Sequence, residues 1–355
     1  MVKLSLCMIV KNEEVFLEQC LLSVQGLVDE IVIVDTGSID KTKEIALKFT
    51  SKVYDFEWCD DFAAARNESL KYATGDWILV LDADEVIAKE DFGRFRNVLE
   101  NENEVGFNLI HRNYTSNIIA TGWISNKDDK YKESLVAEGW WEAKIVRFFV
   151  NKKEVKFKGL VHETVDETLN SLGNIGLLEV PIHHYGKLDI TKLKEKYELY
   201  EKIGQRKLIE EDYNSYYELG RQCVESGKLL DAKKYLSKAV ELNKNCFNCL
   251  FMLGTVCLML EDLFSAELFL IKAIEIEPNF YALYSNLGVV LVKQKKFEEA
   301  VYNFKKAIKL NNNDAKSYKN LGLCLDELGR KNEAYLAFKM AIDLNPKYKE
   351  IINLS

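Results

Sequence analysis

The sequence has little proline, little histidine and no long apolar run. Only three prolines and four histidines occur among 355 residues, of which 48% are hydrophobic. That content supports two folded domains and excludes collagen-like repeats and intrinsic disorder. No segment reaches the roughly 18 apolar residues that a membrane helix needs. A basic excess is also missing, because the formal net charge is −8, and this argues against a nucleic-acid or anionic-membrane binder.

Eight cysteines and a short apolar start bear on the cellular compartment. The cysteines lie mostly in apolar runs of a chain too long to need disulfide bonds, so we expect reduced thiols. Cys246 and Cys249 form a single C-x-x-C with no second pair nearby, which indicates a structural role and no zinc site. The apolar run 4–10 is followed at once by charge and is too short for a signal peptide. We therefore expect a cytoplasmic protein.

Up to about residue 84, short apolar runs alternate with amphipathic stretches. Runs rich in Val, Ile, Leu and aromatic residues, each the length of a strand, occupy 4–10, 30–35, 52–58 and 76–82. Apolar residues recur at helical spacing between the runs, and Ser38 is placed to cap a helix through 40–49. This β-α-β-α order predicts an α/β domain with a mostly parallel, Rossmann-like sheet. Ligands of such sheets bind beyond the carboxyl ends of the strands.

The second half of the sequence repeats every 34 residues. Leu-Gly pairs coincide at 219–220, 253–254, 287–288 and 321–322, and alanines coincide at 232, 266, 300 and 334. Small residues recur in this way where paired helices cross closely. The pattern resembles the tetratricopeptide repeat, with units at 213–246, 247–280, 281–314 and 315–348. It predicts an all-α solenoid that follows the α/β domain.

The ends of the repeat units and the segment before them follow the repeat pattern less closely. Pro278 and Pro346 end two units at the same phase, where the other two units have Lys244 and Asn312. Residues 187–212 are highly charged with a helical pattern, and we interpret them as a connecting helix, or as an extra helix packed onto the repeats. The predicted domains are therefore 1–186 and 213–348, followed by a tail at 349–355.

Acidic residues mark the end of the fourth predicted strand. Asp82 and Asp84 form a D-x-D motif, and residues at i and i+2 of a strand point to the same side. Two such carboxylates can converge on Mg²⁺ or Mn²⁺, which would bridge the phosphates of a nucleotide. An isolated D-x-D is more often a solvated acidic turn, but the strand before it favours the metal site.

A second polar turn follows the second predicted strand. Asp35 begins the stretch 35–42, in which Gly37 and Ser38 permit close approach of a ligand near a helix N-terminus. The alternative is an ordinary turn with a helix cap. No G-x-G-x-x-G follows the first strand, which argues against a nicotinamide or flavin domain.

Four segments in this order resemble the family-2 glycosyltransferases of the GT-A fold. They are KNEE (11–14), VDTGSIDKT (34–42), FAAARNESLKYATGDWILVLDADE (62–85) and RFFVNKKEVKFKGLVHE (147–163). Within that family the segments are similar to the lipopolysaccharide-core β-glucosyltransferases and the bacteriocin peptide S-glycosyltransferases. The resemblance covers about residues 3–186 and implies an enzyme that uses a uridine diphosphate sugar, with Mn²⁺ or Mg²⁺ as cofactor.

The resemblance also implies roles for residues that bind the donor. Asp35 would contact uracil, with Asn12 and Glu13 lining the same pocket. Arg66 would lie near the base or the diphosphate, or alternatively form an ion pair with Asp60 or Asp61 on its own helix. Asp82 would face the ribose or the sugar, and Asp84 would bind the metal. A metal and Arg66 together would neutralise the departing diphosphate.

The catalytic base and the last metal ligand are expected later in the chain. An inverting transferase needs a carboxylate that takes the proton of the acceptor, and Glu163 is the candidate, with His162 beside it. Glu142 is the alternative, because the adjacent tryptophans could stack on sugars. His184 matches the late histidine that completes the metal site in many GT-A enzymes. His183 and His184 could instead form a polar edge, and we interpret His111 as structural.

These expectations define a leading function and two alternatives. The leading one is a metal-dependent inverting transferase that moves a hexose from a uridine diphosphate sugar to a peptide or protein, on Cys, Ser or Thr, with the repeats engaging part of the acceptor. The second is a transferase of lipopolysaccharide-core or surface-polysaccharide assembly, with the repeats serving oligomerisation. The third is a non-catalytic repeat scaffold, against which the retained acidic motifs argue. We expect no nucleic-acid partner.

Overall fold

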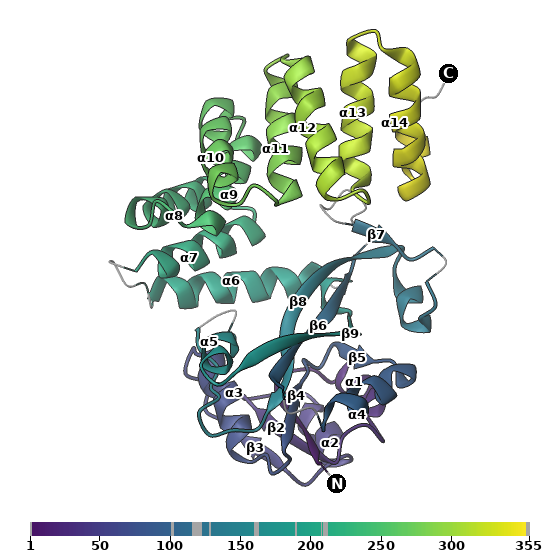
Figure 1. Ribbon diagram of the computed structural model, residues 1–355. Helices are drawn as coiled ribbons and strands as arrows, with labels where there is room; N and C mark the ends of the chain where they lie inside the picture. The colour runs from purple at the N-terminus through teal and green to yellow at the C-terminus, as the bar shows by residue number, and fades with distance from the viewer. Residues whose placement is uncertain are drawn as a thin grey trace. The chain divides into compact units, whose positions relative to one another are not determined.

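The computed structural model of the chain describes residues 2–100, 103–115, 123–127, 129–159, 163–188, 190–206, 208 and 212–352. The chain divides into two compact units (Figure 1). We name Met1–Ser116 with Asn126–Leu193 the sheet unit, and Asn117–Ser125 with Lys194–Ser355 the repeat unit. Each unit is described by itself, and the predicted domain boundaries stay predictions.

Four parallel strands build the first part of the sheet, namely β1 (Leu4–Val10), β2 (Glu30–Asp35), β3 (Val53–Asp55) and β4 (Trp77–Val80). They lie in the order β3-β2-β1-β4. The predicted strands at 4–10 and 30–35 are confirmed at both ends, because their continuous apolar runs are largely buried as central parallel strands require. β3 and β4 are shorter than predicted, since the chain leaves the ladder before the polar loops at the carboxyl edge.

The later strands make the sheet mixed. β8 (Gly139–Val150) pairs antiparallel with β4 and with β6 (Glu104–Tyr114). β9 (Asn174–His184) runs parallel to β6 and antiparallel to the short β5 (Glu85–Ile87). The sheet therefore continues β4-β8-β6-β9-β5. The described residues also include a short strand β7 (Trp123–Ser125).

Short helices cover both faces of this sheet (Figure 1). One face is covered by α1 (Leu17–Ser23), α2 (Thr42–Leu47) and α4 (Phe92–Val98), and the other by α3 (Phe62–Lys71) and α5 (Asp166–Asn170). Single 3₁₀ turns lie at Lys89–Asp91, Lys132–Val136 and Gly186–Leu188. The helix expected over 40–49 is shorter, and Ser38 does not cap it. Instead Asp40 Oδ1 accepts a hydrogen bond from the Thr42 amide at 3.0 Å.

Four successive helix pairs form the repeats. They are α7 (Tyr213–Glu225) with α8 (Leu229–Leu242), α9 (Phe247–Met259) with α10 (Leu263–Ile276), α11 (Tyr281–Lys293) with α12 (Phe297–Leu310), and α13 (Ala315–Glu327) with α14 (Lys331–Leu344). A short α15 (Tyr348–Ile351) follows. The second helix of each pair ends two residues before the position of Lys244, Pro278, Asn312 and Pro346. Proline is therefore not needed to end it.

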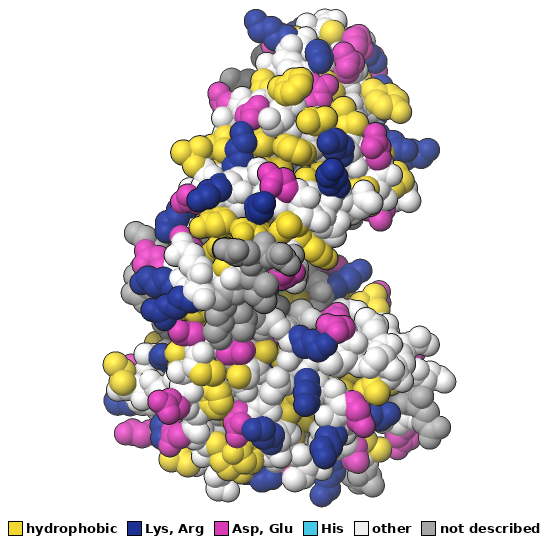
Figure 2. Space-filling model, turned by 90° about the vertical axis from the view of Figure 1, so that its left-hand side faces the viewer, with side chains coloured by type: hydrophobic (Ala, Val, Ile, Leu, Met, Phe, Trp, Pro, Cys, Tyr) yellow, Lys and Arg dark blue, Asp and Glu magenta, His cyan; other side chains and the backbone are white. Residues whose placement is uncertain are grey.

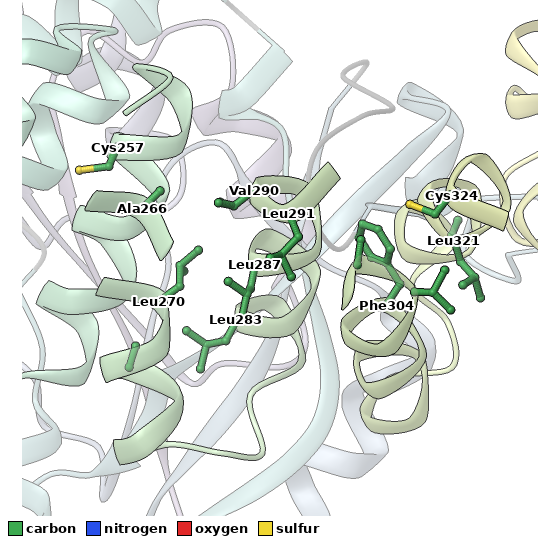
Figure 3. Close-up of a cluster of buried hydrophobic side chains, with 14 of the residues drawn as sticks. Cys257, Ala266, Leu270, Leu283, Leu287, Val290, Leu291, Phe304, Leu321 and Cys324 are labelled. Atoms are coloured by element: carbon green, nitrogen blue, oxygen red, sulfur yellow. The ribbon is translucent and has the colours of Figure 1, made fainter. Parts of the chain in front are cut away.

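The recurring glycines lie where paired helices touch. A Cβ added at Gly288 would lie 2.6 Å from the Phe304 ring, and one at Gly220 would lie 2.6 Å from Leu236. The large side chain of the second helix therefore occupies the space that glycine leaves on the first. Figure 3 shows the resulting core, in which Leu270, Leu287 and Phe304 belong to one buried cluster along the repeats. This explains the 34-residue spacing in physical terms.

The helix α6 (Ile190–Arg206) precedes the repeats. Within the repeat unit the Glu201 carboxylate accepts a hydrogen bond from Lys228 Nζ at 2.7 Å, and a Cβ added at Gly204 would lie 2.7 Å from Gln222 Oε1. These contacts favour the interpretation of this segment as an extra helix packed onto the first repeat. Residues 207 and 209–211 lie outside the described part of the chain.

One cysteine pair differs from the expectation of reduced thiols. Cys246 and Cys249 form a disulfide at the start of α9. The pairing is possible because Cys246 is the N-cap residue and Cys249 lies in the first turn, which brings residues three apart to one side of the helix. The other six cysteines are free thiols, five of them buried.

The repeats also expose large apolar side chains. Leu230, Phe264 and Tyr302 are 75%, 79% and 69% exposed, on α8, α10 and α12. Figure 2 shows one face of the molecule, on which hydrophobic side chains gather among lysines and arginines over the repeat helices. None of the described helices is long and apolar enough to cross a bilayer.

Candidate active site

The turns after β1 and β2 lie side by side at the carboxyl edge of the sheet, because Val10 pairs with Asp35. Asp35 is 1% exposed, and its Oδ1 accepts hydrogen bonds from the amides of Gly37 and Ser38, both at 2.9 Å. Its Oδ2 is buried and has no hydrogen-bond partner among the described residues. A buried carboxylate oxygen in this position can accept a hydrogen bond from a ligand N–H or O–H.

Asn12 and Glu13 hold these two turns together. The Asn12 amide donates to Ser38 Oγ at 2.9 Å, and Asn12 Oδ1 accepts from the Ile39 amide at 2.9 Å. The Glu13 amide donates to Thr42 Oγ1 at 2.7 Å. Asn12 has φ = 55°, a left-handed conformation that asparagine tolerates better than most residues. The turn after β1 therefore fixes the loop that carries Asp35, and Ser38 serves this contact.

Two arginines, the buried Arg66 and the half-buried Arg147, meet at Asp82, just after β4. Arg66 Nη2 lies 2.5 Å from Asp82 Oδ1, and Arg147 Nη2, from β8, lies 3.0 Å from Asp82 Oδ2. Arg66 also donates through Nε to Glu163 Oε1 at 2.6 Å. The alternative pairing of Arg66 with Asp60 or Asp61 is therefore not seen, and Asp61 instead caps α3 by accepting from the Ala64 amide.

The surroundings of these arginines affect their pKa values. Burial alone would lower the pKa of Arg66, but the carboxylates of Asp82 and Glu163 outweigh it and raise the pKa above its ordinary value. Burial would likewise lower the pKa of Arg147, but the carboxylates of Asp82 and Glu85 outweigh it and raise that pKa. Both guanidinium groups are therefore permanent cations at the carboxyl edge, where a diphosphate would carry negative charge.

Glu85 and His111 form a further buried pair that the sequence did not single out as functional. His111 Nε2 lies 2.5 Å from Glu85 Oε1, and Glu85 Oε2 accepts from the Asp82 amide at 2.8 Å. Burial raises the pKa of Glu85, but Arg147 and His111 outweigh this and lower it overall. Burial lowers the pKa of His111. Through the hydrogen bond to Glu85 the pair holds the backbone at Asp82.

Asp84 and His184 face each other across the end of the sheet. His184 Nε2 lies 3.4 Å from Asp84 Oδ2, because the pairing of β5 with β9 sets Glu85 beside His184. The backbone of Gly186 passes close by: a Cβ added there would lie 2.0 Å from Asp84 Oδ2 and 2.8 Å from His184 Nε2. Any side chain at residue 186 would therefore disturb this pair.

The pair Asp84–His184 suits a divalent cation of the manganese class, which accepts carboxylate oxygen and imidazole nitrogen. Asp82, the other predicted ligand, is held by the two arginines. Among the described residues, no three His, Cys, Asp or Glu side chains come together in a way that could hold an ion by themselves. A cation here would thus need further ligands from water or from phosphate oxygens, which Mg²⁺ and Mn²⁺ sites in nucleotide enzymes commonly have.

The two candidate bases lie in different surroundings. Glu163 is brought to the cluster by its contact with Arg66, and its side chain is 11% exposed. Glu142 is exposed and pairs across the strands with Arg112, whereas its neighbour Trp141 pairs with Asn113. Since adjacent strand residues point to opposite faces, Glu142 lies on the face away from Asn113 and His184. His162 lies outside the described residues.

His183 belongs to that opposite face and is fully buried. Its Nδ1 lies 2.7 Å from the Tyr114 hydroxyl, and burial together with Arg112 lowers the pKa of His183 to about 3. Trp140 is also buried there, under the Arg112 guanidinium at 4.3 Å, and is not free to stack on a sugar. Neither His183 nor His184 forms a solvated polar edge, because both side chains are buried.

Comparison with protein families agrees with this geometry. Residues 5–155 match the family model described as Glycosyl transferase family 2. Residues 213–246, 290–329 and 315–348 match models of the tetratricopeptide repeat.

Individual relatives are named for one or the other of these features. A TPR repeat-containing protein of Synechococcus elongatus is 32% identical over 68% of this chain and 57% of its own length. The glycosyltransferase SunS of Bacillus subtilis is 28% identical over 50% of this chain and 38% of its own length. An uncharacterized glycosyltransferase of Rickettsia felis is 25% identical over 59% of this chain and 72% of its own length. The chain thus spans less than two thirds of the length of each of the first two relatives.

Among solved structures, a MamA chain aligns with 43% of this chain and 89% of its own length, at 22% identity and a TM-score of 0.40.

Proposed function

Because the chain carries a glycosyl transferase family 2 domain followed by tetratricopeptide repeats, we propose that it is a metal-dependent inverting glycosyltransferase. It would move a hexose from a uridine diphosphate sugar to a peptide or protein, on Cys, Ser or Thr. The observation that carries this proposal is the cluster in which Arg66 joins Asp82 to Glu163, beside the Asp84–His184 pair.

The donor would bind along the carboxyl edge of the sheet. The buried Oδ2 of Asp35 suits an N–H of the uracil ring, and Asn12 keeps that loop in place. Asp82, fixed by two arginines, suits a hydroxyl of the ribose or the sugar. Arg66 and Arg147 would stabilise the negative charge that develops on the leaving diphosphate. Asp84 and His184 would hold Mn²⁺ or Mg²⁺, which supplies additional positive charge to the same oxygens when bound.

Glu163 would act as the base. Its Oε1 is held by Arg66 Nε, which leaves Oε2 to take the proton of the acceptor as the new bond forms at the anomeric carbon.

The repeats would engage part of the acceptor. A repeat stack offers an extended surface to a peptide, and the exposed side chains of Leu230, Phe264 and Tyr302 provide apolar contacts. Surface-polysaccharide assembly remains the second candidate for the acceptor, since the resemblance of the sheet unit includes transferases of that kind.

Release of uridine diphosphate tests the proposal. Purified protein with Mn²⁺ and a panel of uridine diphosphate sugars should slowly release the diphosphate to water, and one sugar should be preferred. The diphosphate should also raise the melting temperature in the presence of Mn²⁺. Absence of both effects would reject the enzyme and favour the non-catalytic scaffold.

A further inference from the structure

The side chain of His184 is oriented by a single buried amide. His184 Nδ1 lies 2.9 Å from Asn113 Oδ1, and the two residues are register partners on the parallel strands β9 and β6. Asn113 is 2% exposed and His184 is 8% exposed. The Asn113 Nδ2 group points to the His111 carbonyl oxygen at 3.4 Å, which leaves Oδ1 as the atom that faces His184.

This contact determines which nitrogen of His184 is available. Oδ1 of asparagine can only accept a hydrogen bond, so Nδ1 of His184 must carry the proton. In the neutral ring Nε2 then presents its lone pair to Asp84 Oδ2, which lies 3.4 Å away. Two electron-pair donors that face each other in this way are suited to a cation between them.

The surroundings leave the His184 ring little freedom to turn. The His111 ring lies on one side, with 4.7 Å between the ring centroids, and His111 is itself held by Glu85. The backbone of Gly186 lies against Nε2. A half-turn of the imidazole about χ2 would break the Asn113 contact and move Nε2 away from Asp84.

We propose that Asn113 is a positioning residue for metal binding, which fixes the tautomer and the orientation of His184. This inference rests on the proposed function, because the metal is the cofactor of that reaction. Groups of this kind, hydrogen-bonded to a ligating histidine, typically change metal affinity by about 10- to 100-fold when they are removed.

The test measures Mn²⁺ binding by the electron paramagnetic resonance signal of the free ion, with uridine diphosphate present and no turnover. Asn113→Leu, which has a similar volume and no acceptor, should raise the Kd for Mn²⁺ about 10- to 100-fold. Asn113→Asp, which keeps an acceptor oxygen, should bind at least as tightly as the unaltered protein. Unchanged affinity in Asn113→Leu would overturn the inference, as would a loss in Asn113→Asp equal to that in Asn113→Leu.

A double-mutant cycle with His184→Ala separates positioning from general damage. If Asn113 acts through His184, Asn113→Leu should cause no further loss of affinity in the His184→Ala background. An equal loss in both backgrounds would overturn the inference. Should Asn113→Leu not fold, Asn113→Ala replaces it in the same cycle.

The unaltered protein distinguishes this inference from the proposed function. If it binds Mn²⁺ and Asn113→Leu binds equally well, only the role of Asn113 fails. If the unaltered protein binds no Mn²⁺ with the diphosphate, the metal dependence of the proposed function fails and the inference fails with it.

Discussion

The repeat core and the cluster at the carboxyl edge of the sheet are both buried, but they are held together by different forces. In the repeat core, apolar side chains such as Phe304 fill spaces left by glycine, and burial itself provides the stabilisation. In the cluster, carboxylates and guanidinium groups are withdrawn from water, and their mutual attraction largely offsets the penalty of desolvation. We therefore expect repeat-core substitutions to alter stability and cluster substitutions to alter activity.

The largest effect is expected for a substitution of Asp84, beside the cluster. Asp84→Ala removes one of the two side chains that would hold the metal, and the release of uridine diphosphate should fall by about 10⁴-fold, or about 5.5 kcal/mol. The melting temperature without nucleotide should stay close to that of the unaltered protein, because the ion pairs of Arg66 and Arg147 with Asp82 do not involve the Asp84 side chain. Turnover assays and differential scanning fluorimetry check the two expectations, and a variant with full activity would contradict them.

The second prediction concerns a substitution in the repeat core. Phe304→Ala empties a fully buried site, and the free energy of unfolding of the repeats should fall by about 3–5 kcal/mol. Tyr302→Ala, on the same helix but 69% exposed, should change it by less than about 0.5 kcal/mol. Urea unfolding followed by circular dichroism measures both. Release of the diphosphate by the sheet unit should be unchanged in either variant. If Phe304→Ala lost this activity along with its stability, the distinction between the repeat core and the cluster would be wrong.

The third prediction concerns the base. Glu163→Gln keeps an oxygen that accepts from Arg66 but cannot take a proton, so turnover should fall by about 10²- to 10³-fold while the Kd for uridine diphosphate stays the same. Glu142→Gln is the matched control and should be active, since that side chain lies on the other face. The reverse pattern would assign the base to Glu142.

The smallest effect concerns the pH dependence of stability. The pKa of His183 falls from its ordinary value of 6.5 to about 3 in the folded protein. Between these values the unfolded chain binds a proton that the folded one does not, so the free energy of unfolding should fall by up to about 1.4 kcal/mol for each pH unit below 6.5. His183→Gln should remove this contribution, leaving that of His111. Unfolding at pH 7.5 and pH 5 gives the slopes, and identical slopes would contradict the assignment.

The sequence predicted the two regions unequally. The 34-residue spacing predicted the repeat core, because each repeat packs in the same way as the next. The D-x-D motif, Arg66, Glu163 and His184 were also found in advance, and the structure brings them close together. Their roles in catalysis stay predictions, as does that of Asp35.

The residues that sequence reasoning missed share one property. Arg147, Asn113 and Glu85 reach the cluster through the pairing of β5, β6, β8 and β9, whose register involves residues up to about a hundred positions apart. No local pattern encodes that register. Arg147 is the first residue of the segment 147–163, which carried the resemblance, and two phenylalanines follow it. The sequence therefore did offer a signal for this residue.

The pairing of β5 with β9 also has a consequence for the order of synthesis. The partner of Asp84 is supplied by the last strand of the sheet, a hundred residues later in the chain. As the protein emerges from the ribosome, the strands up to β4 can pair early, but the two sides of the proposed cation site meet only after residue 184 has been made. In the proposed transferase, Asp84 and His184 would thus be unable to hold a metal together before the sheet is complete.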